Sequence, residues 1–175
     1  MIDDKDIPDD VKGDLVPEID PKKLFDEKEY ATIILGSDTA GKKDLENADC
    51  AVILVSHSTS REEKDEALKQ LKENDARTFL KNAIDRTKKP EQKAPLIAAC
   101  WETGLDFSSD YLYFAELITH SDFYVSFEAF TVIQELETSR EILEQTLNIL
   151  ESAKKPHENT LAAIEYVRSQ LNALS

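Results

Sequence analysis

The sequence predicts an all-α protein made of stacked antiparallel helical hairpins, about four pairs of helices in all. Apolar residues recur at helical spacing, and one arrangement of small and large side chains returns at hairpin intervals. Residue types that cap helix N-termini stand before most of these stretches. The 175 residues suffice for one hydrophobic core, so we expect an acidic flexible arm at 1–20 and a helical repeat domain at 21–175.

The arm is predicted from its charge and its prolines. Pro8 and Pro17 interrupt any regular element there. Asp20 and Pro21 then supply an N-cap and a proline at the first helical position, so a first helix should begin here and end at Gly36. The acidic residues of the arm are Asp3, Asp4, Asp6, Asp9, Asp10, Asp14, Glu18 and Asp20.

Two short apolar runs, Ala31–Leu35 and Cys50–Val55, are compatible with either helices or buried parallel strands. Strands would give the alternative fold, a small α/β N-terminal unit followed by a helical bundle. The segment between the runs is short for a crossover helix that must cover a sheet, and two strands alone make a poor sheet. We therefore expect both runs to be helical.

Further helix boundaries follow from local signals downstream. Thr59-Ser-Arg-Glu62 and Thr138-Ser-Arg-Glu141 have the spacing of capping boxes, in which the hydroxyl and the glutamate each accept a backbone N–H. Gly104 should end the helix that contains Trp101. Additional starts are expected at Asp75, at Ser109 or Asp110, and at Ser121-Asp122.

The repeat consists of a small residue followed by large apolar residues one and four positions later. It occurs at Ala67-Leu68 with Leu71, Ala129-Phe130 with Ile133, and Ala163-Ile164 with Val167. Ala98-Ala99 falls midway between the first two occurrences. A second stripe, Phe79, Leu80, Ala83 and Ile84, returns 34 residues later as Tyr113, Phe114, Leu117 and Ile118. Two interleaved stripes predict paired helices, with Lys88-Lys89 and Lys154-Lys155 between the members of two pairs.

Residues 110–133 resemble a HEAT repeat, in which a turn aspartate, a valine three residues later and an early small residue mark the second helix. Asp122, Val125 and Ala129 stand at these positions, while Ser126 replaces the basic residue that often follows the valine. The resemblance extends over roughly 45–174 and implies an α-solenoid whose stacked pairs stabilise one another. Ala129 should pack against a neighbouring helix, and Ser126 should point away from the stack.

The last helix is expected to be a solubilising cap with one apolar side. Leu161, Ile164, Val167 and Leu171 should face inward, and Glu158, Glu165, Arg168 and Asn172 should face outward.

Recognisable catalytic or cofactor chemistry is lacking in the pattern. His57, His120 and His157 have no metal-ligand spacing, and His57 and His120 stand where helices should end and can complement the helix dipole. Cys50 and Cys100 have apolar neighbours typical of reduced core thiols, although one disulfide between them remains compatible with the sequence. The spacing of Gly36–Gly41 approaches a phosphate loop without its Lys-Ser/Thr ending. We expect no metal, no cofactor and no enzymatic activity.

The formal net charge of −15 opposes binding to nucleic acid or to anionic membranes. The start of the chain lacks the basic and apolar regions of a secretory signal, and no apolar run is long enough to span a membrane. We therefore expect a cytoplasmic protein whose partner is another protein.

The function predicted by the resemblance is a non-enzymatic protein–protein interaction module, a scaffold or adaptor that uses one face of the solenoid. Trp101, Phe107, Tyr111 and Tyr124 are the candidate partner-binding residues, since aromatic side chains cluster here in excess of what one helix side can bury. Two alternatives remain open: an acidic inhibitor or immunity-type protein that masks a basic site, and an enzyme that uses the Gly36–Gly41 loop to bind a nucleotide.

Overall fold

The computed structural model describes residues 26–36 and 40–174, and within these ranges the chain forms α-helices, one short 3-10 helix and no strand. Ala31–Leu35 lies in α1 and Cys50–Val55 in α2, so the all-α prediction is confirmed for this part of the chain and the α/β alternative is not supported. The helices are α1 (Glu27–Leu35), α2 (Lys42–Val55), α3 (Arg61–Glu73), α4 (Arg77–Arg86), α5 (Pro90–Glu102), α6 (Tyr111–Ile118), α7 (Phe123–Gln134), α8 (Arg140–Glu151) and α9 (Glu158–Ala173), with the 3-10 turn η3 (Ser108–Asp110) before α6.

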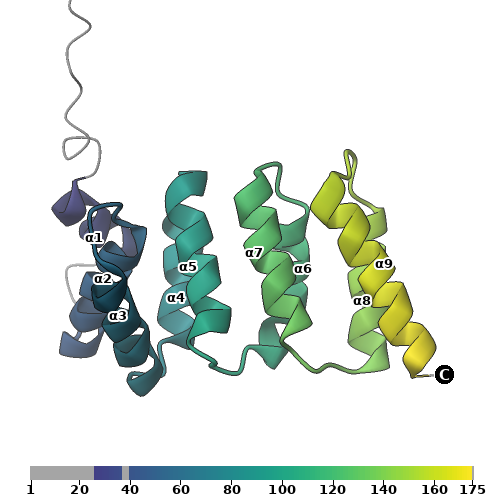
Figure 1. Ribbon diagram of the computed structural model, residues 1–175, viewed down its shortest axis with the longest axis horizontal. Coiled ribbons are helices and arrows are strands. Elements are labelled where there is room, and N and C mark those ends of the chain that lie inside the picture. The colour runs from purple at the N-terminus through teal and green to yellow at the C-terminus, as the bar shows by residue number, and fades with distance from the viewer. Residues whose placement is uncertain (1–25, 37–39, 175) are drawn as a thin grey trace, which may run out of the picture.

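The helices are arranged in two layers along the long axis of the molecule (Figure 1). Consecutive helices pack as the pairs α4–α5, α6–α7 and α8–α9. One layer contains α2, α5, α7 and α9, each in contact with the next, while in the other layer α1 contacts α4 and α6 contacts α8. The N-terminal unit departs from simple pairing, because α3 lies on α2 and it is α2 that packs beside α5.

The C-terminal backbone carbonyls of helix α1 accept hydrogen bonds from a side chain of α4. Gly36 follows the helix with a φ of +66°, a left-handed conformation that favours glycine. The Arg86 guanidinium, from α4, donates to the free carbonyls of Ile34 and Leu35 at 2.7 and 2.9 Å. The predicted stop at Gly36 is confirmed; the described helix begins at Glu27 behind the cap Asp26, and the arm at 1–20 and the predicted start at Asp20-Pro21 lie outside the described residues.

Both predicted capping boxes were placed one residue too early. The cap of α3 is Ser60. Its hydroxyl accepts the Glu63 N–H at 3.2 Å, and the Glu63 carboxylate accepts the Ser60 N–H at 2.7 Å. Thr59 instead donates its hydroxyl to the Ile53 carbonyl at the end of α2. At α8 the cap is Ser139, which accepts from the Ile142 N–H and has no glutamate to complete a box.

The other boundaries are mostly as predicted. Asp122 caps α7 by accepting the N–H groups of Tyr124 and Val125, and Gly104 follows the end of α5 with a φ of +63°. Asp75 does not cap α4; it has a φ of +48° and pairs with Arg77, which opens the helix.

The small residues at the positions that the repeat singled out are buried. Ala67, Ala99, Ala129 and Ala163 are all buried, each with a large apolar residue buried nearby on the same helix. The prediction for Ser126 was wrong, because its side chain is fully buried rather than turned away from the stack. It receives a hydrogen bond from the Asn159 amide of α9 at 2.8 Å.

The predicted inward side of α9 was partly misplaced. Glu158, Glu165, Arg168 and Asn172 are exposed and Val167 is buried, as expected. Leu161, however, is 52% exposed, because the buried side is centred on Asn159, Thr160, Ala163 and Val167. The polar residues Asn159 and Thr160 therefore occupy positions where the pattern placed leucine.

Candidate functional site

Two of the four aromatic residues that the sequence singled out lie in the core. Phe107 and Tyr111 are fully or almost fully buried, and Phe107 packs edge-on against Phe114 with their ring centroids 5.6 Å apart. Phe107 stands directly before η3 and Tyr111 opens α6, and both side chains belong to the hydrophobic core. Burial raises the pKa of the Tyr111 phenol. Neither ring is on the surface available to a partner.

The other two, Trp101 and Tyr124, belong to an aromatic patch that we define as Trp101, Phe123, Tyr124 and Phe127. Tyr124 is 66% exposed, Phe127 45% and Trp101 36%. On α7 the three rings stand opposite the buried side formed by Val125, Ser126 and Ala129. Phe123 contacts both neighbours, edge-on to Tyr124 at 5.4 Å and stacked with Phe127 at 6.0 Å between ring centroids.

Trp101 joins α5 to this side of α7 through a hydrogen bond. Its indole N–H donates to the Glu128 carboxylate at 3.0 Å, which holds the ring in one orientation. A second carboxylate, Glu102, lies next to it in sequence, and its pKa is raised mainly by burial and further by Glu128 and Asp65. The aromatic patch thus has two carboxylates, Glu102 and Glu128, at its margin.

The surface is hollowed near Trp101, where α5 and α7 end. In Figure 1 these two helix ends lie at the lower edge of the molecule. This acidic hollow has a volume of about 450 Å³ and is lined by Trp101, by the apolar residues Leu105, Val132 and Leu136, and by the carboxylates Asp106, Glu135 and Glu137. Among the described residues, none of those that line it is lysine or arginine. The loop residues that line this hollow do not recur at a regular spacing, so the apolar repeat in the sequence did not predict it.

The cysteines are core thiols, as predicted, and the pairing left open by the sequence is not formed. Cys50 and Cys100 are both buried and free. Burial raises the pKa of Cys50 to about 11 and raises that of Cys100 further. Cys100 stands in the wall of the acidic hollow, but a thiol so far from ionisation is a poor nucleophile.

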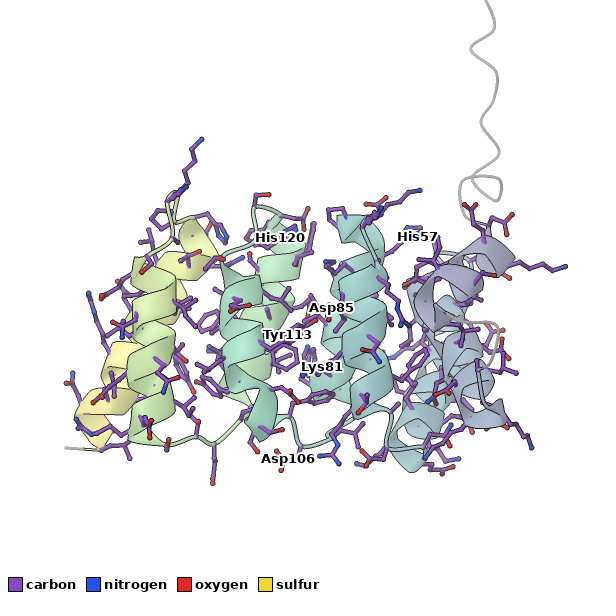
Figure 2. All side chains as sticks on the ribbon, turned by 180° about the vertical axis from the view of Figure 1, so that it is seen from behind. His57, Lys81, Asp85, Asp106, Tyr113 and His120 are labelled. Atoms are coloured by element: carbon purple, nitrogen blue, oxygen red, sulfur yellow. The ribbon has the colours of Figure 1, made fainter. Side chains whose placement is uncertain are left out.

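The histidines lie away from the hollow. In Figure 2 His57 and His120 are at one edge of the molecule and Asp106 is at the other. His120 follows the end of α6 as expected, but it is no cation there: its Nδ1 accepts the Asp122 N–H at 3.0 Å, and burial lowers its pKa. The described residues contain no group of histidine, cysteine and carboxylate side chains suited to a metal ion. Of the suggested Gly36–Gly41 nucleotide loop, residues 37–39 lie outside the described part.

A polar cluster between α4 and α6 was missed by the sequence reasoning (Figure 2). The Lys81 ammonium pairs with Asp110 and lies 5.2 Å from the centre of the Tyr113 ring. The Tyr113 hydroxyl donates to Asp85 at 2.8 Å, and burial, followed by Asp85, raises its pKa. The polar groups of these four residues are all engaged with one another across two helical pairs. We therefore interpret the cluster as a structural contact between α4 and α6 rather than a binding site.

None of the described helices combines the length and apolar character needed to cross a membrane. In comparisons with known proteins, no family model, no curated protein and no solved structure matches the chain.

Proposed function

We propose that the protein is a non-enzymatic protein-interaction module, a scaffold or adaptor of HEAT-like architecture that binds another protein through the outer face of α5 and α7. The two-layer order of the helical pairs supports the architecture, because stacked pairs create an extended face on each side. The signature residues Asp122 and Ala129 support it locally: one caps α7 and the other is buried in the contact side of that helix.

The observation that carries the proposal is the aromatic patch. Exposed apolar residues on a monomer are usually scattered singly, whereas Phe123 contacts both Tyr124 and Phe127. Trp101 of α5 is bonded to Glu128 of the same helix α7. Tryptophan and tyrosine are enriched among residues that contribute most to binding energy at interfaces. The indole is already held by Glu128, so its ordering costs little when a partner binds.

The test is a comparative pull-down from the native lysate, with the double variant Tyr124→Ser/Phe127→Ser beside the wild type. The matched control is Leu161→Ser, which removes a similarly exposed apolar side chain from α9. We expect specific proteins to be recovered with the wild type and the control but lost with the double variant, while thermal melting shows all three folded. Equal recovery with the double variant would show that the aromatic patch does not bind the partner.

Salt separates this proposal from the acidic-inhibitor alternative. Binding through the aromatic patch should keep an apolar contribution when the salt concentration is raised, because apolar contacts are not screened, and it should be lost in the double variant. A partner held by net charge alone should be released by salt and retained by the double variant.

A further inference from the structure

We propose that the partner presents an arginine side chain to the acidic hollow, with its guanidinium stacked on the Trp101 indole and paired with Glu135 and Glu137. The inference rests on the proposed function and specifies the chemistry of the partner: a short basic segment in which apolar residues flank the arginine.

The shape and lining of the hollow fit a side chain that is apolar along its stem and charged at its tip. A volume of about 450 Å³ is ample for one long side chain, and Leu105, Val132 and Leu136 provide apolar walls for the methylene groups. Trp101 also lines the hollow, and its indole is held by the hydrogen bond to Glu128, which is not part of the lining. Arginine matches this combination better than lysine, because its planar guanidinium stacks on indole and pairs with carboxylates through two hydrogen bonds.

The wall of the hollow contains carboxylates and no basic side chain, while two basic residues lie near its edge. Asp106 accepts the Ser108 N–H at 2.9 Å, which together with Arg77 lowers its pKa and keeps it ionised. Arg77 is held by Asp75 and donates to the backbone carbonyl of Asp106, and the Lys72 ammonium lies near Gly104, 3.5 Å from where a Cβ on that glycine would stand. A partner cation would therefore pair with Glu135 and Glu137 inside the hollow rather than compete with Arg77, which is already paired with Asp75.

A second hollow indicates that the partner segment is extended. It has a volume of about 540 Å³ and lies between the ends of α7 and α9. Glu135, Leu136 and Glu137 line both hollows, and among the described residues the second one also has no lysine or arginine in its wall. A chain laid across Leu136 could place consecutive outward side chains on either side of it.

The experiment uses Trp101 as its own reporter, because it is the only tryptophan of the sequence. The full-length protein is titrated with a short capped peptide that carries one arginine between two leucines, and with otherwise identical peptides that carry citrulline or lysine. Trp101 fluorescence and the indole N–H resonance follow binding. We expect the arginine peptide to bind about tenfold more tightly than the citrulline peptide, the scale of one charge-assisted hydrogen bond, with lysine in between.

The variant Glu135→Gln/Glu137→Gln should bind the arginine peptide only as well as the citrulline peptide. The control Glu158→Gln/Glu165→Gln changes the net charge equally on exposed positions of α9 and should leave the preference intact. Equal binding of arginine and citrulline peptides, an unperturbed indole, or an equal effect of the control would overturn the inference. These outcomes are independent of the lysate experiment, which alone decides whether the aromatic patch binds a partner.

Discussion

The core of the α6–α7 pair and the junction between that pair and α9 are stabilised in different ways. Within the pair the buried side chains are apolar, and Phe114, Val125 and Ala129 are fully enclosed. At the junction the buried groups are polar: Asn159 donates to Ser126 and to the Phe123 carbonyl, and Thr160 donates to the Ile118 carbonyl. His157 Nε2 adds a hydrogen bond to the His120 carbonyl at 2.8 Å.

The difference shows what packed helices need at each kind of contact. Apolar packing tolerates small shifts of one helix against another, whereas a buried amide must meet particular acceptors or leave them unsatisfied. The polar junction therefore fixes the position of the last pair relative to α6 and α7. Because these contact residues are polar, a search for apolar periodicity in the sequence could not identify the junction.

The largest expected effect is at the apolar core. Phe114→Ala should lower the free energy of unfolding by about 3–5 kcal/mol, because the ring is fully buried and its removal leaves a cavity beside Phe107. Urea melts measure the change, with the exposed Tyr124→Ala as a control expected to stay within about 0.5 kcal/mol of the wild type. Similar losses at both sites would mean that Phe114 is not enclosed.

Overpacking tests the same core from the opposite direction. Ala129→Leu should destabilise by about 1–3 kcal/mol, since the position is fully buried and a longer side chain must displace its neighbours. The same urea melts apply. A silent Ala129→Leu would remove the argument that a small residue is required there.

The polar junction is probed by a double-mutant cycle. Ser126→Ala and Asn159→Ala should each destabilise the protein, with a coupling energy of about 0.5–3 kcal/mol, because the two side chains are bonded at 2.8 Å in a buried position. Ser126→Leu, which the sequence suggested as a nearly neutral substitution, should now be damaging as well, since it overpacks the junction and removes the acceptor of Asn159. Strictly additive effects of the two alanine substitutions would show that the bond contributes nothing.

The smallest expected effect concerns pH near the same junction. The pKa of His120 is lowered by burial, so the unfolded chain binds a proton at a higher pH than the folded protein does. Stability from this residue is complete above its ordinary pKa of about 6.5 and declines as the pH falls toward the folded value. His120→Asn keeps a side-chain acceptor without titrating in this range, so urea melts between about pH 7 and 5 should show a shallower decline for the variant. Parallel profiles would contradict a half-buried His120 whose pKa is lowered by folding.

The sequence by itself determined the helical class and most helix boundaries, for reasons that are local. Gly36 and Gly104 permit left-handed φ values, and Asp122 satisfies the first N–H groups of α7 within its own turn. The alanine stripe located the buried side of α7 because burial along one helix follows its 3.6-residue period. The helical nature of Cys50–Val55 needed one further argument, that two strands alone cannot make a stable sheet.

Only the tertiary structure decided which residues are available for binding and which polar groups are buried. Phe107 and Tyr124 are both aromatic, yet one is in the core and the other on the surface, because exposure depends on what the neighbouring helices cover. Ser126 became a core residue only because Asn159, which is 33 positions away, supplies its partner. The acidic hollow arises in the same way, since it brings Trp101 together with Glu135 and Glu137, which no local period connects.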